Sequence, residues 1–374
     1  MKKLALVEVL ESIKDTRRKR SVMYPVHEVL IIMLLAVICG ATSYAKVEMF
    51  GNSKREWLEK FLDLEYGITD ACTFRNIIKE IYTQKLHSVF CEWMKSVVSE
   101  LTGVIAIDGK TARRTRDKSK RPLHVISTFS HECGLVMGQL ACEEKSNEIT
   151  AIPKLLDMLE IKGCIVTIDA MGTQKDIAEK IISKNADYIL SLKENQKTMY
   201  RDVKLYLDDI RKDKDVINSS DYYRTIEKGH GRIESRTCVI SEEIGWLNSK
   251  EDWVGISGIG AIYCEAEENG QKSKQSHYFI FSCKGLTAKE LMGHKRSHWS
   301  IENNLHWVLD MAFREDESRA RKENSAENFN VLRQIALNIL KSEKSFKGSI
   351  TDKQFKCLLD SSYLNTIVEN WICS

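Results

Sequence analysis

The chain has 374 residues, 43% of them hydrophobic and 29% charged, and its 56 basic and 53 acidic side chains give a net charge of +3. A chain of this length is expected to form two or three domains, and this composition is ordinary for a soluble globular protein. Collagen-like, mucin-like and coiled-coil proteins and small disulfide scaffolds are excluded, and so are long disordered linkers. Because the charges nearly balance, a polyanionic partner would have to be recognised by a local cluster of cations.

The cysteines and the apolar runs bear on the compartment. Eleven cysteines are scattered without a Cys-x-x-Cys pair, and the first residues lack the apolar core of a signal peptide. We therefore expect reduced thiols and a cytoplasmic protein. The most apolar run, Val29–Ala41, has thirteen residues, whereas a transmembrane helix needs about 20. It is predicted to be a buried helix, and no membrane association is expected.

Residues 1–101 are predicted to form a helical N-terminal domain. Pro25 can open a helix over Val26–Cys39, and Gly40 can close it. Apolar residues spaced by three and four positions predict three further helices, Glu48–Leu62, Asp70–Tyr82 and Gln84–Leu101.

The pattern changes at Gly103, where strands begin to alternate with helices. Three strands in a meander, followed by helix, strand, helix, strand and helix, predict a mixed α/β sheet with helices on its faces. Residues 213–285 look like a β-rich insertion, and helices return at Thr287–Asp310, at Ala326–Lys341 and in a tail over 346–374. The predicted strands are Val104–Asp108, Leu123–Phe129, Leu135–Cys142, Cys164–Asp169, Ala186–Lys193, Tyr222–Ile226, Arg236–Ile240, Trp253–Glu265 and His277–Cys283; the helices between them are Ile149–Leu159, Thr173–Lys184 and Gln196–Lys212.

Two of the apolar strands end in an aspartate, Asp108 and Asp169. Open α/β sheets place their ligands at the carboxyl ends of strands, and the small residues after each aspartate would let a bulky group approach. Two neighbouring carboxylates repel each other unless a cation lies between them, and Mg²⁺ prefers such oxygen ligands. Two ions roughly 3.5–4 Å apart would support phosphodiester cleavage. The alternative is that each aspartate is only a helix cap or turn residue.

A strongly basic stretch follows Asp108. A cluster of this kind binds phosphate backbones through counterion release, although it could equally be a solvated loop. The sequence Gly109-Lys110-Thr111 resembles the end of a phosphate-binding P-loop, but the spacing from Gly103 is wrong, so no nucleotide cofactor is expected. The basic residues are Lys110, Arg113, Arg114, Arg116, Lys118, Lys120 and Arg121.

The segment Gly293–Arg321 is the densest in functional residue types. On a helix, His298, Glu302, His306 and Asp310 follow one another at intervals of four along one face. Glu302 is the candidate third carboxylate, with Arg296 and His298 close enough to contact phosphate. Two alternatives are open: a zinc site formed by His294 with His298, or by His298 and His306 with Glu302; and an amphipathic helix of purely structural role.

Two polar segments remain ambiguous. Lys145-Ser146-Asn147-Glu148 precedes a predicted helix, which Ser146 or Asn147 could cap. The segment His230–Arg236, which includes Arg232, could reach a nucleic-acid backbone or be an ordinary hairpin tip.

Several ordered motifs give the chain a resemblance to the H-repeat-associated insertion-sequence transposases, which lie beside Rhs elements in bacteria. This family belongs to the DDE superfamily with an RNase H-like core. The Tyr-Arg-Glu-Lys signature of a neighbouring group is not met, since His298 stands where that group has arginine. The motifs are YPVHEVLIIMLLAVICGATS, IAIDGKTARR, KSNEITAIPKLL, IVTIDAMGTQKDIAEKI, ADYILSLKENQ, HGRIESR, RSHWSIENNLHWVLDMAFREDESRAR and ENFNVLRQIALNIL.

The resemblance implies an RNase H-like catalytic domain over residues 102–345 that carries the β-rich insertion. It implies that Asp108, Asp169 and Glu302 form a DDE triad that binds Mg²⁺ or Mn²⁺. The expected function is that of a DNA transposase, which cleaves the ends of an insertion sequence and transfers the strands into target DNA.

The expected partners are double-stranded DNA, as terminal inverted repeats and target, and a second copy of the chain in a homodimer on DNA. The protein would then be associated with the nucleoid when bound. Two alternatives stay open: a catalytically silent or domesticated DNA-binding protein, and a stand-alone metal-dependent nuclease. The predicted DNA-contacting residues are Lys110, Arg113, Arg114, Arg116, Arg232, Arg296 and His298.

Overall fold

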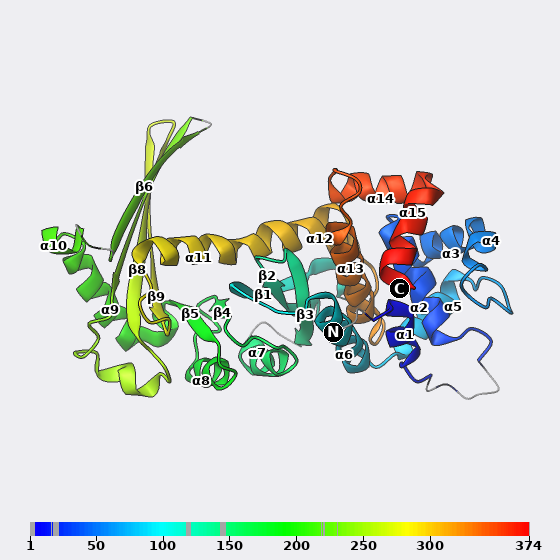
Figure 1. Ribbon diagram of the computed structural model, residues 1–374, viewed down its shortest axis with the longest axis horizontal. Helices are drawn as coiled ribbons and strands as arrows, with labels where there is room; N and C mark the ends of the chain where they lie inside the picture. The colour runs from blue at the N-terminus through cyan, green and yellow to red at the C-terminus, as the bar shows by residue number, and fades with distance from the viewer. Residues whose placement is uncertain are drawn as a thin grey trace.

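The computed structural model describes residues 4–15, 17, 22–116, 121–142, 147–217, 219, 221–229 and 231–373. Of the residues singled out above, Lys118, Lys120, Lys145, Ser146 and His230 lie outside this set. The molecule is elongated: helices from both ends of the chain gather at one side, a sheet lies in the middle, and long strands project at the other side (Figure 1).

The N-terminal part is helical, as its apolar spacing predicts. In α2, every residue except His27 is buried, because apolar side chains surround this helix and each side needs a neighbour. The predicted helix Glu48–Leu62 is wrong in its bounds: Ser43 caps an earlier start, and the chain breaks into two helices. The helices are α1 (Leu6–Glu11), α2 (Val26–Ile38), α3 (Tyr44–Ser53), α4 (Arg55–Leu58), α5 (Ala71–Glu80) and α6 (Thr83–Val97).

The first five strands form the predicted mixed sheet, in the order β3-β2-β1-β4-β5. β1, β2 and β3 pair antiparallel as a meander, whereas β1, β4 and β5 pair parallel. Helices α7 and α8 lie on one side of this sheet and α11 on the other (Figure 1). The expected RNase H-like α/β architecture is confirmed. The elements are β1 (Val104–Ala112), β2 (Leu123–Ser130), β3 (Leu135–Cys142), α7 (Glu148–Asp157), β4 (Ile165–Ile168), α8 (Lys175–Ser183), β5 (Asp187–Leu192), α9 (Lys197–Ile210) and α10 (Lys214–Ile217).

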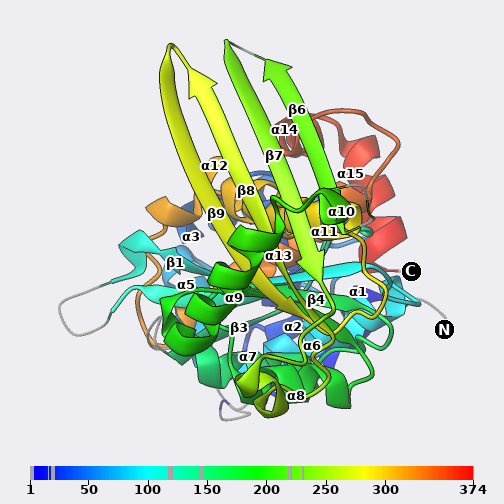
Figure 2. The ribbon, with the colours of Figure 1, turned by 90° about the vertical axis from the view of Figure 1, so that its left-hand side faces the viewer.

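The β-rich insertion does not form a separate sheet. β9 pairs antiparallel with β5, so all nine strands form one sheet that ends in β9-β8-β7-β6. The strands are β6 (Tyr222–Gly229), β7 (Arg232–Ser241), β8 (Gly258–Glu268) and β9 (Gln271–Phe281). Their ends next to the core are apolar and buried, whereas residues 271–276 of β9 are polar and exposed. The outer halves therefore project as two hairpins, here called the arm (Figures 1 and 2).

A long helical segment crosses the sheet face after the arm. It consists of α11 (Ala288–Ile301), a π turn (Glu302–His306) and α12 (Trp307–Met311). Thr287 and Glu290 form a capping box at its start. The predicted helix Thr287–Asp310 is confirmed in extent, but the π turn within it was not predicted: the Trp307 N–H donates to the Glu302 carbonyl, five residues earlier. Such turns are rare and often mark functional sites.

The last helices join the two parts of the molecule. α13 (Ser325–Ser342) packs against α2, α5 and α6 on one side and against β3 on the other. The tail folds as α14 (Ile350–Leu359), α15 (Ser361–Ile367) and a π turn (Val368–Ile372), and its Asn365 accepts a hydrogen bond from Trp57 of α4. Across the described part of the chain, no helix has both the length and the hydropathy to cross a membrane.

Candidate active site

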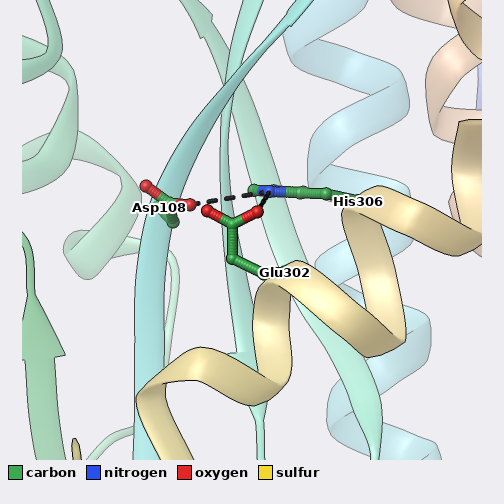
Figure 3. Close-up of side chains that lie close together, drawn as sticks. All are labelled: Asp108, Glu302 and His306. Carbon is green, nitrogen blue, oxygen red and sulfur yellow. Dashed lines mark ion pairs between the residues drawn. The ribbon is translucent and has the colours of Figure 1, made fainter. Parts of the chain in front are cut away.

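Three side chains converge where the long helical segment crosses β1. Asp108 comes from β1, and Glu302 and His306 come from the two ends of the π turn (Figure 3). One potential metal-ligating atom from each of the three lies within 4.8 Å of the others. His306 Nδ1 lies 3.5 Å from Asp108 Oδ2 and 4.0 Å from Glu302 Oε2. Two carboxylates and an imidazole are a donor set that can hold a divalent cation.

Asp108 does not lie at the end of its strand, so this prediction was wrong. β1 continues to Ala112 because residues 109–112 keep their antiparallel pairing with β2. The parallel pairing with β4 stops earlier, at Ile107 and Ile168. Asp108 is therefore the first residue of β1 that has no partner on β4. The expected strand end is found on the side of β1 that faces β4, but not on the side that faces β2.

Asp169 directly follows β4, as predicted, and the parallel register places it next to Asp108. Its Oδ1 accepts hydrogen bonds from the backbone N–H groups of Met171, at 3.0 Å, and Gly172, at 3.3 Å. The aspartate thus shapes the turn after β4, the role foreseen as the alternative. It is not part of the three-residue cluster, but its charge helps to raise the pKa of Asp108.

The electrostatics of the cluster favour a bound cation. Burial, followed by the negative charge of Glu302, raises the pKa of Asp108 to about 7 from an ordinary 3.8. Burial lowers the pKa of His306 to about 3, helped by the charge of Lys110. The imidazole is therefore neutral at pH 7, which is the form that binds metals. Its Nε2 is buried without a hydrogen-bond partner.

Lys110 lies two residues beyond Asp108 and contacts carboxylates instead of facing outward. Its Nζ lies 2.6 Å from Glu315, 2.8 Å from Asp310 and 3.7 Å from Asp316. Only 13% of its side chain is exposed, and Glu315 is almost fully buried. These contacts join β1 to the segment just after the π turn. They were not foreseen, because they connect residues about 200 positions apart.

The other predicted DNA contacts lie in three different settings. Arg113, Arg114 and Arg116 are exposed after β1, although Arg113 contacts Asp316 at 3.3 Å. Arg232 lies at the outer end of β7 in the arm and Arg296 lies on α11, and each contacts a glutamate.

His298 is buried against β4. Its Nδ1 lies 2.9 Å from Thr167 Oγ1, and burial lowers its pKa to about 4. The only cluster of potential metal ligands found among the described residues contains neither His294 nor His298. Both zinc sites considered from the sequence are therefore wrong.

A buried polar chain lies next to Asp108 and was missed in the sequence. His124 Nε2 lies 2.6 Å from Glu148 Oε1, and its Nδ1 lies 2.7 Å from Thr111 Oγ1. A side chain at position 109 would come within 2.4 Å of the Glu148 carboxylate. Gly109 therefore makes room for this pair, not for a ligand as expected. Asn147 lies at the N-cap of α7 but its side chain makes no capping bond.

Comparison with known proteins covers both parts of the chain. Residues 7–94 match the family described as DDE_Tnp_1-associated, and residues 100–339 match the Transposase DDE domain. The H repeat-associated putative transposase YhhI of Escherichia coli K12 is 38% identical, and the match covers 97% of each chain. The putative transposase YncI of E. coli O157:H7 is 36% identical, covering 97% of this chain and 94% of that protein.

Among solved structures, a piggyBac transposase synaptic complex with hairpin DNA matches at a TM-score of 0.43 and 10% identity. That match covers 98% of this chain and 78% of the other. At this level the structural likeness adds nothing to the sequence matches.

Proposed function

The chain belongs to the DDE-domain transposases, whose family model spans residues 100–339, and on this basis we propose that it moves a bacterial insertion sequence by cutting and joining DNA strands. The likeness to H-repeat-associated transposases is confirmed by the relatives. The observation that supports a catalytic role is the convergence of Asp108 and Glu302, 194 residues apart in the chain, on one buried imidazole.

The proposed catalytic carboxylates are Asp108, Asp169 and Glu302. Asp108 is central, since Glu302 faces it from the π turn and Asp169 follows its parallel neighbour β4. His306 is the additional group that the geometry suggests. Because its ring is buried and neutral, it would serve as a ligand or as an acceptor that orients one, not as a base.

Mg²⁺ or Mn²⁺ is the proposed cofactor. The donor set fits such an ion. Burial, followed by the negative charge of Glu302, raises the pKa of Asp108, and a bound cation would offset both effects. When bound, a pair of such ions activates the attacking oxygen and stabilises the leaving oxygen of a phosphodiester. The carboxylates of Asp108, Asp169 and Glu302 would hold the metal ions, with His306 as a further candidate ligand.

The test is a cleavage assay on labelled DNA that carries the ends flanking this gene. Wild type is compared with Asp108→Asn and Glu302→Gln in Mg²⁺, Mn²⁺ or chelator, with the exposed Glu251→Gln as a control of equal charge change. We expect metal-dependent cutting at the ends by wild type and control only. Equal cutting by the two site variants would refute the assignment. DNA that is bound but never cut would indicate a silent DNA-binding protein.

Strand transfer needs a separate readout, because a nuclease and a transposase share this chemistry. Pre-cut ends are incubated with a supercoiled plasmid, and joined products are detected by their slower migration. Cutting without joining would identify a stand-alone nuclease. A homodimer holding two ends is part of the proposal, and a product with both ends joined to one plasmid would support it.

The exposed arginines after β1 are the proposed contacts to the DNA backbone. Arg113, Arg114 and Arg116 lie on the surface close in sequence to Asp108, where they can bind phosphates without disturbing the core. Replacing one by glutamine should weaken binding similarly for all sequences and lower the salt dependence by about one charge.

A further inference from the structure

The ring of His306 is buried without the hydrogen bonds that a structural histidine makes. Its side chain is only 8% exposed, and no hydrogen bond of either ring nitrogen is found among the described residues. Burying a polar group without a partner is unfavourable, so buried polar side chains normally have one. A purely structural role does not account for this ring, and its nitrogens are available to a ligand.

The surroundings of the ring indicate which ligand it takes. Nδ1 points toward the carboxylates of Asp108 and Glu302 (Figure 3), 3.5 Å from an oxygen of the first and 4.0 Å from an oxygen of the second. An N–H···O bond measures about 2.7–3.2 Å, so neither contact is a hydrogen bond. A nitrogen and two carboxylate oxygens that face one another at this longer spacing can share a cation. Glu302 is 53% exposed, so a cation can reach the three groups from solvent.

The segment that carries His306 is fixed to the sheet. Asp310 lies four residues further along the chain, and Lys110 of β1 donates a hydrogen bond to it at 2.8 Å. Lys110 and Asp108 face the same side of β1, since they are two residues apart on one strand. This contact therefore keeps the ring beside Asp108 when no ion is bound, as a preorganised ligand requires.

An imidazole nitrogen distinguishes between the two ions proposed for this site. Mg²⁺ prefers oxygen ligands and gives up its waters reluctantly, so a buried nitrogen contributes little to its binding. Mn²⁺ also accepts carboxylates, and as a transition-metal ion it binds imidazole as well. Two carboxylates with one imidazole thus favour Mn²⁺, whereas carboxylates alone suit both ions.

We propose that His306 makes this site selective for Mn²⁺ over Mg²⁺ by supplying a nitrogen ligand. The inference rests on the proposed function, which requires a divalent cation at the same carboxylates and leaves the choice between the two ions open.

Pulsed electron–nuclear double resonance on bound Mn²⁺ tests the ligand directly, without DNA and without turnover. The protein is labelled with ¹⁵N in its histidines only, and the spectrum reports whether a ¹⁵N nucleus is bonded to the ion. We expect this coupling in wild type and in His298→Asn, a control that removes a buried histidine of the same helical segment outside the cluster. The coupling should disappear in His306→Asn. Asp108→Asn should bind less Mn²⁺, which locates the ion.

Selectivity is measured by titrating Mg²⁺ against bound Mn²⁺ and following the signal of the released ion. Wild type should bind Mn²⁺ about tenfold more tightly than Mg²⁺ or better, and this ratio should fall about tenfold in both His306→Asn and His306→Asp. The two substitutions differ in charge, which affects both ions alike, so they should agree in the ratio. Circular dichroism verifies that the variants are folded, and the spectrum of labelled wild type depends on no variant.

The failure of this inference can be told apart from that of the proposed function. Bound Mn²⁺ without ¹⁵N coupling in wild type, or a ratio of affinities that neither substitution changes, would refute the role of His306, while the carboxylate site and the transposase activity would stand. A wild type that binds neither ion would overturn the inference too. If it also leaves the DNA ends uncut with both ions, the proposed function is wrong as well.

Discussion

The charge cluster around Asp108 predicts that removing its charge stabilises the protein while abolishing activity. Without metal, burial and the neighbouring carboxylates raise the pKa of Asp108 to about 7 from 3.8. Between pH 3.8 and about pH 7, the native state therefore keeps a proton on Asp108 that the unfolded chain has already lost. Its free energy of unfolding must fall as pH rises through this window. Asp108→Asn keeps the side-chain shape and removes the charge.

The magnitude follows from the two pKa values. The interval from 3.8 to about 7 corresponds to about 4 kcal/mol at about 1.36 kcal/mol per pH unit. Asp108→Asn should thus raise the free energy of unfolding by up to about 4 kcal/mol at pH 8, less at pH 6, and not at pH 4, where the wild-type carboxylate is protonated as well. Mg²⁺ should close the gap at pH 8, because it binds the wild-type native state and stabilises it by mass action.

Urea unfolding of both proteins at pH 4, 6 and 8, with and without Mg²⁺, measures these differences. Asp252→Asn, which removes one partner of an exposed ion pair, should change stability by less than about 1 kcal/mol at every pH. An Asp108→Asn variant that is less stable than wild type in chelator at pH 8, or a difference independent of pH, would refute the electrostatic reasoning.

Three more outcomes are expected. Lys110→Met should cost about 3–5 kcal/mol in urea unfolding, because it leaves the buried Glu315 unpaired; a loss below about 1 kcal/mol would show that these contacts are weak. Gly109→Ala should destabilise the protein by about 1–3 kcal/mol and abolish cleavage, because the added methyl group would meet the Glu148 carboxylate. The control Gly293→Ala lies in open space on α11 and should be neutral or stabilising. Equal effects of the two substitutions would contradict the steric argument. Glu148→Gln should weaken the contact to His124 and lower cleavage while leaving DNA affinity unchanged by anisotropy, and an unchanged cleavage rate would exclude a role for this pair in positioning β1.

The local patterns predicted most of the core sheet because each strand is apolar, short and bounded by turn residues. The same logic located Asp169 at the end of β4 and Glu302 on the long helical segment. The prediction that β1 ends at Asp108 was wrong. The strand continues because residues 109–112 pair with β2, and the sequence of these residues does not by itself indicate that partner. Nothing in the periodicity separates a strand that ends at a carboxylate from one that continues as a hairpin.

The long-range contacts could not be predicted from the sequence for the same reason. A lysine after Asp108 looks like a DNA contact from its charge alone, and only the fold brings Asp310 and Glu315 to it. The burial of His298 depends on β4 lying beneath α11. The π turn could not be predicted, because the spacing of apolar residues does not distinguish a bond to the fifth preceding residue from the usual bond to the fourth.

The contacts of Lys110 explain how the carboxylates stay together before a cation binds. Asp108 and Lys110 are two residues apart on β1, so they face the same side of the strand. Asp108 repels Glu302 there, whereas Lys110 attracts Asp310 and Glu315, which lie just beyond the π turn. The attraction holds the helical segment against β1 at the point where the two carboxylates would otherwise separate. The cation proposed for this site would then enter a geometry that is already set, so its binding energy would not be spent on moving the helix.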